Sequence, residues 1–319
     1  MLRFLARRVP SAVVVLFLAS VLIFAIIRLI PGDPASTLAG PDASPASVAA
    51  IRQSLGLDRS VPAQYVHWLG QIFTLHLGRS YIIGGTISSL VADSFVYTVV
   101  LALAALLIAV VLALIIGPVW ASTRRRWIDA TLTGVNTAAI ALPTFVTGVL
   151  LVLVFGVLVP ILPSGGVPPD GLTANLSITA QYLVMPAVCL ALPVAATLSR
   201  YLAETLRTEL RQPYITTARA LGVSGRRLVW RHALRNALPT TLTVLGIQTG
   251  ALLGGAVLVE AIFAWPGVGQ LIQQAISGRD YPVVQVLLLL SVGVFVLIQT
   301  LTDIAHAYLD PRVRIGGTS

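Results

Sequence analysis

Lysine is absent from this 319-residue chain, because all 21 of its basic residues are arginine. A phosphate loop of the usual nucleotide-binding kind needs a lysine ammonium group on the nucleotide phosphates. The chain is therefore not expected to bind or hydrolyse ATP on its own.

Cysteine and charge are scarce as well. The single cysteine, Cys189, lies in an apolar run, which leaves no pair for a disulfide within the chain and no cysteine cluster for a metal. Charged residues make up 10% of the chain, against about 25% in a typical soluble domain. With 56% hydrophobic residues and a mean hydropathy of +0.90, the chain is predicted to be an all-α integral membrane protein.

Six apolar segments are each near or above the ~20 residues that a helix needs to cross a bilayer. They cover residues 10–30, 95–121, 131–160, 180–199, 238–263 and 283–308. Six transmembrane helices are predicted, the first as a retained anchor rather than a cleaved signal. The third segment is long for one span and is expected to include interfacial residues or a tilt.

The arginines predict the orientation. With the N-terminus inside, sixteen arginines fall in inner segments and four in outer ones, as the positive-inside rule requires. Both termini of this multi-pass membrane protein are predicted to be cytoplasmic. A net charge of +9 could indicate a nucleic-acid partner. The arginines lie between apolar runs rather than on one basic face, which argues against that function.

The segment 31–94 is the largest outer piece. Amphipathic helices are predicted around 47–55 and 63–75, and the second carries apolar residues at helical spacing, namely Tyr65, Trp68, Leu69, Ile72 and Phe73. Such a stripe indicates packing against the membrane domain or contact with lipid headgroups. His67 and His76 are nine residues apart and do not share a helix face cleanly, so no metal site is predicted.

The stretch 213–239 is the most informative part of the chain. Small residues precede Gly222, and arginines surround it, between two long apolar segments. Small side chains let a partner's groove close around a helix backbone. A docking helix for a cytoplasmic protein is therefore predicted here.

Polar residues within apolar segments are candidates for a translocation path or gate, because they are costly in a membrane. These candidates are Asn136, Thr144, Gln248, Glu260 and Gln299. Glu260 and the turn 264–270 are predicted to form part of an outer gate. Hydrogen bonds between helices, or an ion pair for Glu260, explain the same residues equally well.

Several motifs in order resemble the first, or B-type, permease subunit of the peptide/nickel family of ABC importers. They are the opening residues 2–35 with PGDP at 31–34, HLGRSY at 76–81, the docking loop 217–239, VEAIFAWPGVG with RDYPVVQ at 259–285, and LDPRVR at 309–314. The resemblance covers essentially the whole chain. It implies a type I importer permease fold and import of di- or oligopeptides.

The resemblance also implies partners. These are a second, similar permease, two cytoplasmic ATPase domains that use ATP and Mg, an extracytoplasmic binding protein, and membrane lipid. The coupling helix falls at about 214–224, and its implied contacts with the ATPase are Tyr214, Thr217, Ala218, Arg219, Ala220, Gly222 and Val223. Leu221 replaces a common lysine, His76 a common acidic residue, and Thr216 and Thr217 stand where an acidic residue often heads the motif.

The predicted organisation has four parts. Residues 1–30 hold the cytoplasmic N-terminus and first span, 31–94 the extracytoplasmic segment, 95–309 a core permease domain with the coupling loop 200–237, and 310–319 a cytoplasmic tail. Three alternatives remain. These are an ion-coupled secondary transporter, an intramembrane serine protease, and an ABC importer of nickel or another small solute.

Overall fold

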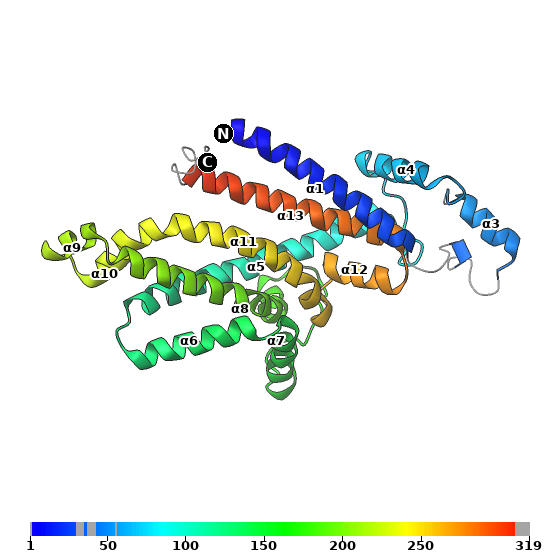
Figure 1. The fold of residues 1–319 in the computed structure, drawn as a ribbon. Coiled ribbons are helices and arrows are strands. Elements are labelled where there is room, and N and C mark those ends of the chain that lie inside the picture. Colours follow the sequence, from blue (N-terminus) through cyan, green and yellow to red (C-terminus); the bar gives the residue numbers. More distant parts are fainter. Residues whose placement is uncertain (1, 30–34, 37–42, 55, 310–319) are drawn as a thin grey trace. The chain divides into compact units, whose positions relative to one another are not determined.

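The computed structural model describes residues 2–29, 35–36, 43–54 and 56–309. Its regular elements in these ranges are helical, apart from an isolated antiparallel bridge between Arg79 and Thr86 (Figure 1). The predicted tail 310–319 and the PGDP motif at 31–34 lie outside the described residues. The helices are α1 (Leu2–Leu29), α3 (Pro45–Ser54), α4 (Val61–Phe73), α5 (Ile87–Ser122), α6 (Arg126–Ala141), α7 (Thr144–Leu151), η1 (Val152–Leu158), α8 (Leu176–Glu209), α9 (Pro213–Ala220), α10 (Gly225–Arg227), η2 (Leu228–Ala233), α11 (Leu234–Ile262), α12 (Val268–Ser277) and α13 (Tyr281–Leu309).

Five helical stretches among the described residues are long and apolar enough to cross a membrane. They are Val9–Leu29, Ile87–Ser122, Leu176–Glu209, Gly225–Ile262 and Tyr281–Ile304. A sixth span arises if α6 and the α7–η1 pair are counted together. The number of apolar segments is thus as predicted. Each of the five continuous helices contains the apolar segment that was predicted for it, with at most one residue missing at an end.

The third predicted span, 131–160, is not one helix. α6 and the α7–η1 pair meet at an angle of 102°. The break falls at Leu142 and Pro143, both of which have extended backbone angles. Proline disfavours the helical conformation in the residue before it and has no N–H for the helix ladder. Of the two expectations for this segment, the tilt of one continuous helix was wrong, because the chain bends sharply at the proline. That the segment includes interfacial residues stays a prediction.

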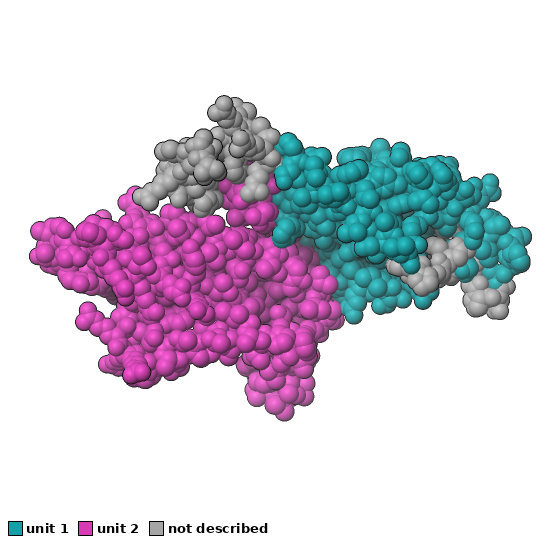
Figure 2. Space-filling view, in the orientation of Figure 1, with its two compact units in different colours: residues 1–97, 266–296 teal, residues 98–265, 297–319 magenta. Residues whose placement is uncertain are grey.

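The chain divides into two compact units, coloured separately in Figure 2. Unit 1 comprises Met1–Tyr97 and Pro266–Val296. Its core gathers apolar side chains of α12 and the start of α13 around Ile87, which is fully buried. α12 buries Val268, Leu271, Ile272 and Ala275, whose spacing places them on one face of a helix.

Unit 2 comprises Thr98–Trp265 and Leu297–Ser319, and α8 is its central helix. α8 packs against α6, α7, α11 and η2. The part of α5 in this unit buries a stripe of residues four apart, Leu101, Ala105, Ala109 and Ala113. At Gly117 an added Cβ would lie 2.8 Å from Leu202 on α8, so small side chains set the distance between these two helices.

Candidate functional site

The predicted docking helix forms as α9. Pro213 opens it, preceded by Gln212 in extended conformation, which suits a residue before proline. Ile215 is fully buried in a cluster with α8, η2 and α11, and Ala218 packs against the same cluster. These two residues are three apart and share one face. α9 is therefore held firmly on its inner side.

Gly222 ends this helix in a left-handed conformation, with φ of 82°. The Val223 amide donates to the Ala218 carbonyl (3.1 Å), and the Gly222 amide donates to the Arg219 carbonyl (3.0 Å). This is the hydrogen-bond pattern of a Schellman motif, with glycine at the position after the C-cap. Val223 also packs against the inner cluster beside Ala218. Gly222 therefore closes the helix and turns the chain back onto the core.

The outer side of α9 is small and exposed. Thr216, Thr217 and Ala220 are exposed on the side away from Ile215 and Ala218. The predicted small-residue set is thus divided, with Ala218 turned inward and Ala220 and Gly222 at the surface. Exposed arginines surround the helix and its return segment, namely Arg219, Arg226, Arg227, Arg231 and Arg235. The surface is a small, uncharged ridge within a basic rim.

Tyr214 joins the docking helix to the two long helices beside it. Its hydroxyl donates to a Glu209 carboxylate oxygen (2.7 Å) and accepts from Asn236 Nδ2 (2.9 Å). Burial raises the pKa of Tyr214, and the hydrogen bond to Glu209 raises it further. The phenol therefore keeps its proton at neutral pH and remains a donor to Glu209 at the end of α8.

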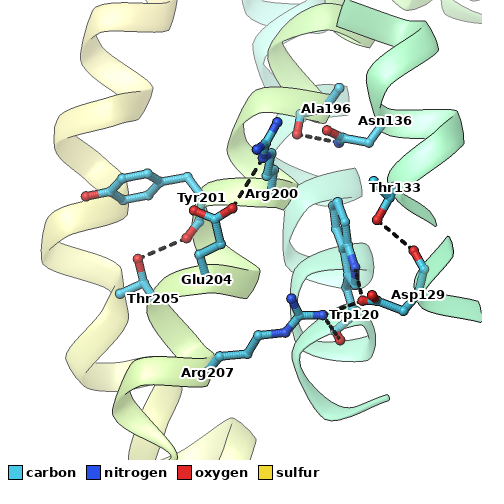
Figure 3. Close-up of polar contacts among 10 residues, drawn as sticks. All are labelled: Trp120, Asp129, Thr133, Asn136, Ala196, Arg200, Tyr201, Glu204, Thr205 and Arg207. Carbon is cyan, nitrogen blue, oxygen red and sulfur yellow. Dashed lines mark hydrogen bonds and ion pairs between the residues drawn. The ribbon is translucent and has the colours of Figure 1, made fainter. Parts of the chain in front are cut away.

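The end of α8 that leads into α9 is held by a polar cluster that sequence analysis did not find (Figure 3). Asp129 of α6 accepts from Arg207 of α8 (2.6 Å) and from Trp120 Nε1 of α5 (2.9 Å). Arg207 also donates to the Trp120 carbonyl and lies 6.0 Å from the centre of its ring. Because 78 residues separate Asp129 from Arg207, no local spacing indicated the pair.

A family model, described as the binding-protein-dependent transport system inner membrane component, matches residues 109–315. An accompanying N-terminal model of the same transport systems matches residues 1–102. The chain belongs to this family. It is therefore a multi-pass membrane permease component of an ABC importer, a class in which ATP hydrolysis takes place in partner subunits.

Similar proteins support this membership along nearly the whole chain. A putative peptide transport system permease protein of Brucella abortus (strain 2308) is 39% identical over 308 residues, covering 97% of this chain and 98% of its own. The glutathione transport system permease protein GsiC of Escherichia coli (strain K12) is 33% identical over 314 residues, covering 98% and 99%. An inward-facing MetNI methionine ABC transporter matches with a TM-score of 0.57 at 21% identity, over 69% of this chain and 96% of that one. This last likeness shows the fold alone.

The predicted path residues of this permease have different environments. Asn136 is buried and donates to the Ala196 carbonyl of α8 (2.6 Å), so its amide joins two helices (Figure 3). Thr144 begins α7 just after the bend, and its carbonyl lies 3.3 Å from Cys189 Sγ. Gln248 and Gln299 are half-buried. Their lining of a path stays a prediction.

Glu260, the predicted gate residue, is fully buried near the end of α11. Its carboxylate accepts from the Thr98 hydroxyl of α5 (2.7 Å), and its carbonyl accepts from the Trp265 amide (2.8 Å). The latter bond closes α11 in a turn at Ala264, whose φ is 48°. The carboxylate thus lies where α5 meets the closing turn of α11.

A second polar pair connects two motifs noted in the sequence, HLGRSY and RDYP. The Ser80 hydroxyl donates to Asp280 Oδ2 (2.5 Å), and the Ile82 amide donates to the same oxygen (3.2 Å). Ser80 and Asp280 are both buried. No local spacing in the sequence indicated this contact, because 200 residues separate the two partners.

Proposed function

We propose that this chain is one of two permease subunits of an ATP-driven importer of di- or oligopeptides, and that α9 is its coupling helix. The second permease, two ATPase domains on the cytoplasmic side and an extracytoplasmic binding protein complete the assembly. In this proposal both termini lie in the cytoplasm. The peptide substrate is supported by the names of the relatives, one a peptide and one a glutathione permease.

In this proposal the exposed ridge of α9 is the surface that contacts the ATPase partner. Its side chains are small, so a partner's groove can approach the backbone closely. Its inner side is anchored by Ile215 and Ala218, and its far end is closed by Gly222. A helix held in this way moves as one piece with α8 and α11, so displacement by a partner is transmitted to the membrane helices.

The test replaces Ala220 at the centre of the ridge. An indole at this position overpacks a closed interface, which costs about 1–3 kcal/mol. A loss of this size weakens ATPase docking by roughly fivefold to over a hundredfold. We expect Ala220→Trp to lose both co-purification of the ATPase subunits and substrate uptake, at normal membrane insertion.

Ala220→Ser is the matched control, because it keeps a small side chain on the same exposed surface. It is expected to retain docking and uptake. If the small residues served only to turn the loop, Ala220→Trp would behave like Ala220→Ser in both assays, and the coupling role of α9 would be rejected.

Glu260 is proposed to act in the outer gate, supported by its carboxylate beside the turn that closes α11. Glu260→Gln keeps the shape and an oxygen that accepts from Thr98, but it removes the charge. We expect reduced uptake and reduced stimulation of ATPase activity by the binding protein. Wild-type values for both in this variant, with Thr98→Val as a control for the hydrogen bond, would assign Glu260 to structure alone.

The substrate is tested through the binding protein. Mass spectrometry of the ligand that co-purifies with it should detect di- or oligopeptides. A metal complex or a non-peptide solute in this position would contradict the peptide assignment without affecting the coupling proposal.

A further inference from the structure

α4 lies directly against the membrane-spanning part of α1. The Tyr65 hydroxyl of α4 and the Ser20 hydroxyl of α1 are 2.8 Å apart. The Phe24 ring of α1 lies 5.3 Å from the Tyr65 ring and 5.8 Å from the Trp68 ring, measured between centroids. Both helices belong to unit 1, and in Figure 1 they lie close together.

Arginines on either side of the apolar run limit how α1 can sit in the bilayer. Between Arg8 and Arg28 the run has 19 residues, or about 28 Å of helix. The hydrocarbon core is about 30 Å thick, so the whole run is needed to cross it. Ser20 is eight residues from Arg28 and therefore lies about 12 Å inside the core.

Because Ser20 lies inside the hydrocarbon core, the part of α4 that contacts Ser20 must lie inside the core as well. Tyr65 meets Ser20 well below the boundary, and a tyrosine side chain is shorter than that depth. The backbone of α4 at this point therefore lies below the boundary as well. At the boundary itself, the Arg28 guanidinium donates to the Gln64 side chain, so the charge at the end of the span is paired with α4.

The remaining surface of α4 divides into an apolar and a polar stripe. Val66 and Phe73 are 68% and 81% exposed, and they are seven residues apart, which is two helical turns. The polar stripe consists of His67 and of Thr74, the C-cap residue that directly follows α4; they are again seven apart and both exposed. Each polar residue directly follows an apolar one, so the stripes lie about 100° apart around the helix.

We propose that α4 is immersed in the outer part of the lipid bilayer, with Val66 and Phe73 in contact with acyl chains and His67 and Thr74 toward the headgroups. The partner of the exposed apolar stripe is lipid, because α4 is docked on a membrane span of which only 17% is buried within the described residues. The segment after the first span then returns into the membrane instead of standing free in water.

Nitroxide scanning of the full chain tests this directly. Val66→Cys, His67→Cys, Phe73→Cys and Thr74→Cys are made separately on a Cys189→Ser background. Each is spin-labelled and placed in nanodiscs of phosphatidylethanolamine and phosphatidylglycerol. Collision with oxygen, which concentrates in lipid, is compared with collision with a water-soluble nickel chelate.

The logarithm of the oxygen-to-nickel accessibility ratio should be positive at residues 66 and 73 and negative at residues 67 and 74. The neighbouring pairs are matched controls, since a shift of one residue should reverse the sign. Nickel access at 66 and 73 equal to that at 67 and 74 would place α4 in water. Low access of both reagents at 66 and 73 would mean that protein covers the stripe, and either result overturns the proposal.

Discussion

Gly222 is the residue at which backbone conformation matters most in the segment that follows α9. Its φ of 82° lies in the left-handed region, and an added Cβ would meet nothing within 4 Å. The need for glycine there is thus conformational, not steric. An L-residue in this conformation costs roughly 1–2 kcal/mol.

Gly222→Ala is therefore expected to loosen the end of α9 without a clash. Amide hydrogen exchange at residues 221–223 should be about fivefold faster or more, since 1 kcal/mol corresponds to a factor of about five. Gly225→Ala is the control, because Gly225 does not have a positive φ and an added Cβ there also meets open space. Equal exchange in the two variants would show that the cap does not need glycine.

Within unit 1, Asp280 joins the loop after Gly78 to the residues that precede α13. It is 1% exposed and accepts two hydrogen bonds, from the Ser80 hydroxyl and the Ile82 amide. Asp280→Ala leaves the buried Ser80 hydroxyl without this acceptor, which costs about 1–3 kcal/mol. It also removes the acceptor of the Ile82 amide, but Ile82 is exposed and water can replace that bond. We expect a clearly lower midpoint of thermal unfolding in detergent.

Asp280→Asn tests the effect of the charge separately from that of the hydrogen bonds. The amide oxygen can still accept from Ser80 and Ile82, so the loss should be smaller than in Asp280→Ala. Equal midpoints for wild type and Asp280→Ala would mean that the Ser80 pair does not hold the loop.

At the scale of helices, α11 and α13 meet at a glycine. An added Cβ at Gly246 would overlap the side chain of Thr302, whose hydroxyl is held by a hydrogen bond to the Ile298 carbonyl (2.8 Å). Gly246→Ala is expected to cost about 1–3 kcal/mol through overpacking. Gly254 lies on the same helix with open space around it.

The measurement is unfolding of the full chain by SDS in mixed micelles. Gly246→Ala should unfold at a lower SDS fraction than wild type, and Gly254→Ala should not. Thr302→Ala in the Gly246→Ala background should recover part of the loss. A Gly246→Ala variant as stable as Gly254→Ala would contradict close packing of α11 against α13 at this point.

For the whole molecule, the arginine distribution predicts which loops face the cytoplasm. The α9–α10 region and residues 124–126 should be inside, and residues 164–170 outside, because basic loops are retained on the cytoplasmic side. On a Cys189→Ser background, Asp170→Cys should react with an impermeant thiol reagent in intact cells. Gly225→Cys should react only after permeabilisation, and its labelling from outside would reverse the orientation.

The membrane class and the positions of the spans followed from the sequence, because hydropathy and charge are properties of local segments. The short helix α9 was predictable for the same reason, since small residues and Gly222 lie within ten positions of each other. Pro143 was visible, but the 102° bend was not, because the angle depends on how α7 packs against α8 and α11.

The tertiary structure alone decided which polar residues meet. Asp129 with Arg207, Ser80 with Asp280, and Thr98 with Glu260 are each separated by 78 residues or more. Composition and periodicity carry no information on such pairs, because they form only when helices pack. The same holds for α4. The sequence predicted an apolar stripe that includes Tyr65 and Trp68, but only the structure shows that these two residues pack against Ser20 and Phe24 of the first span.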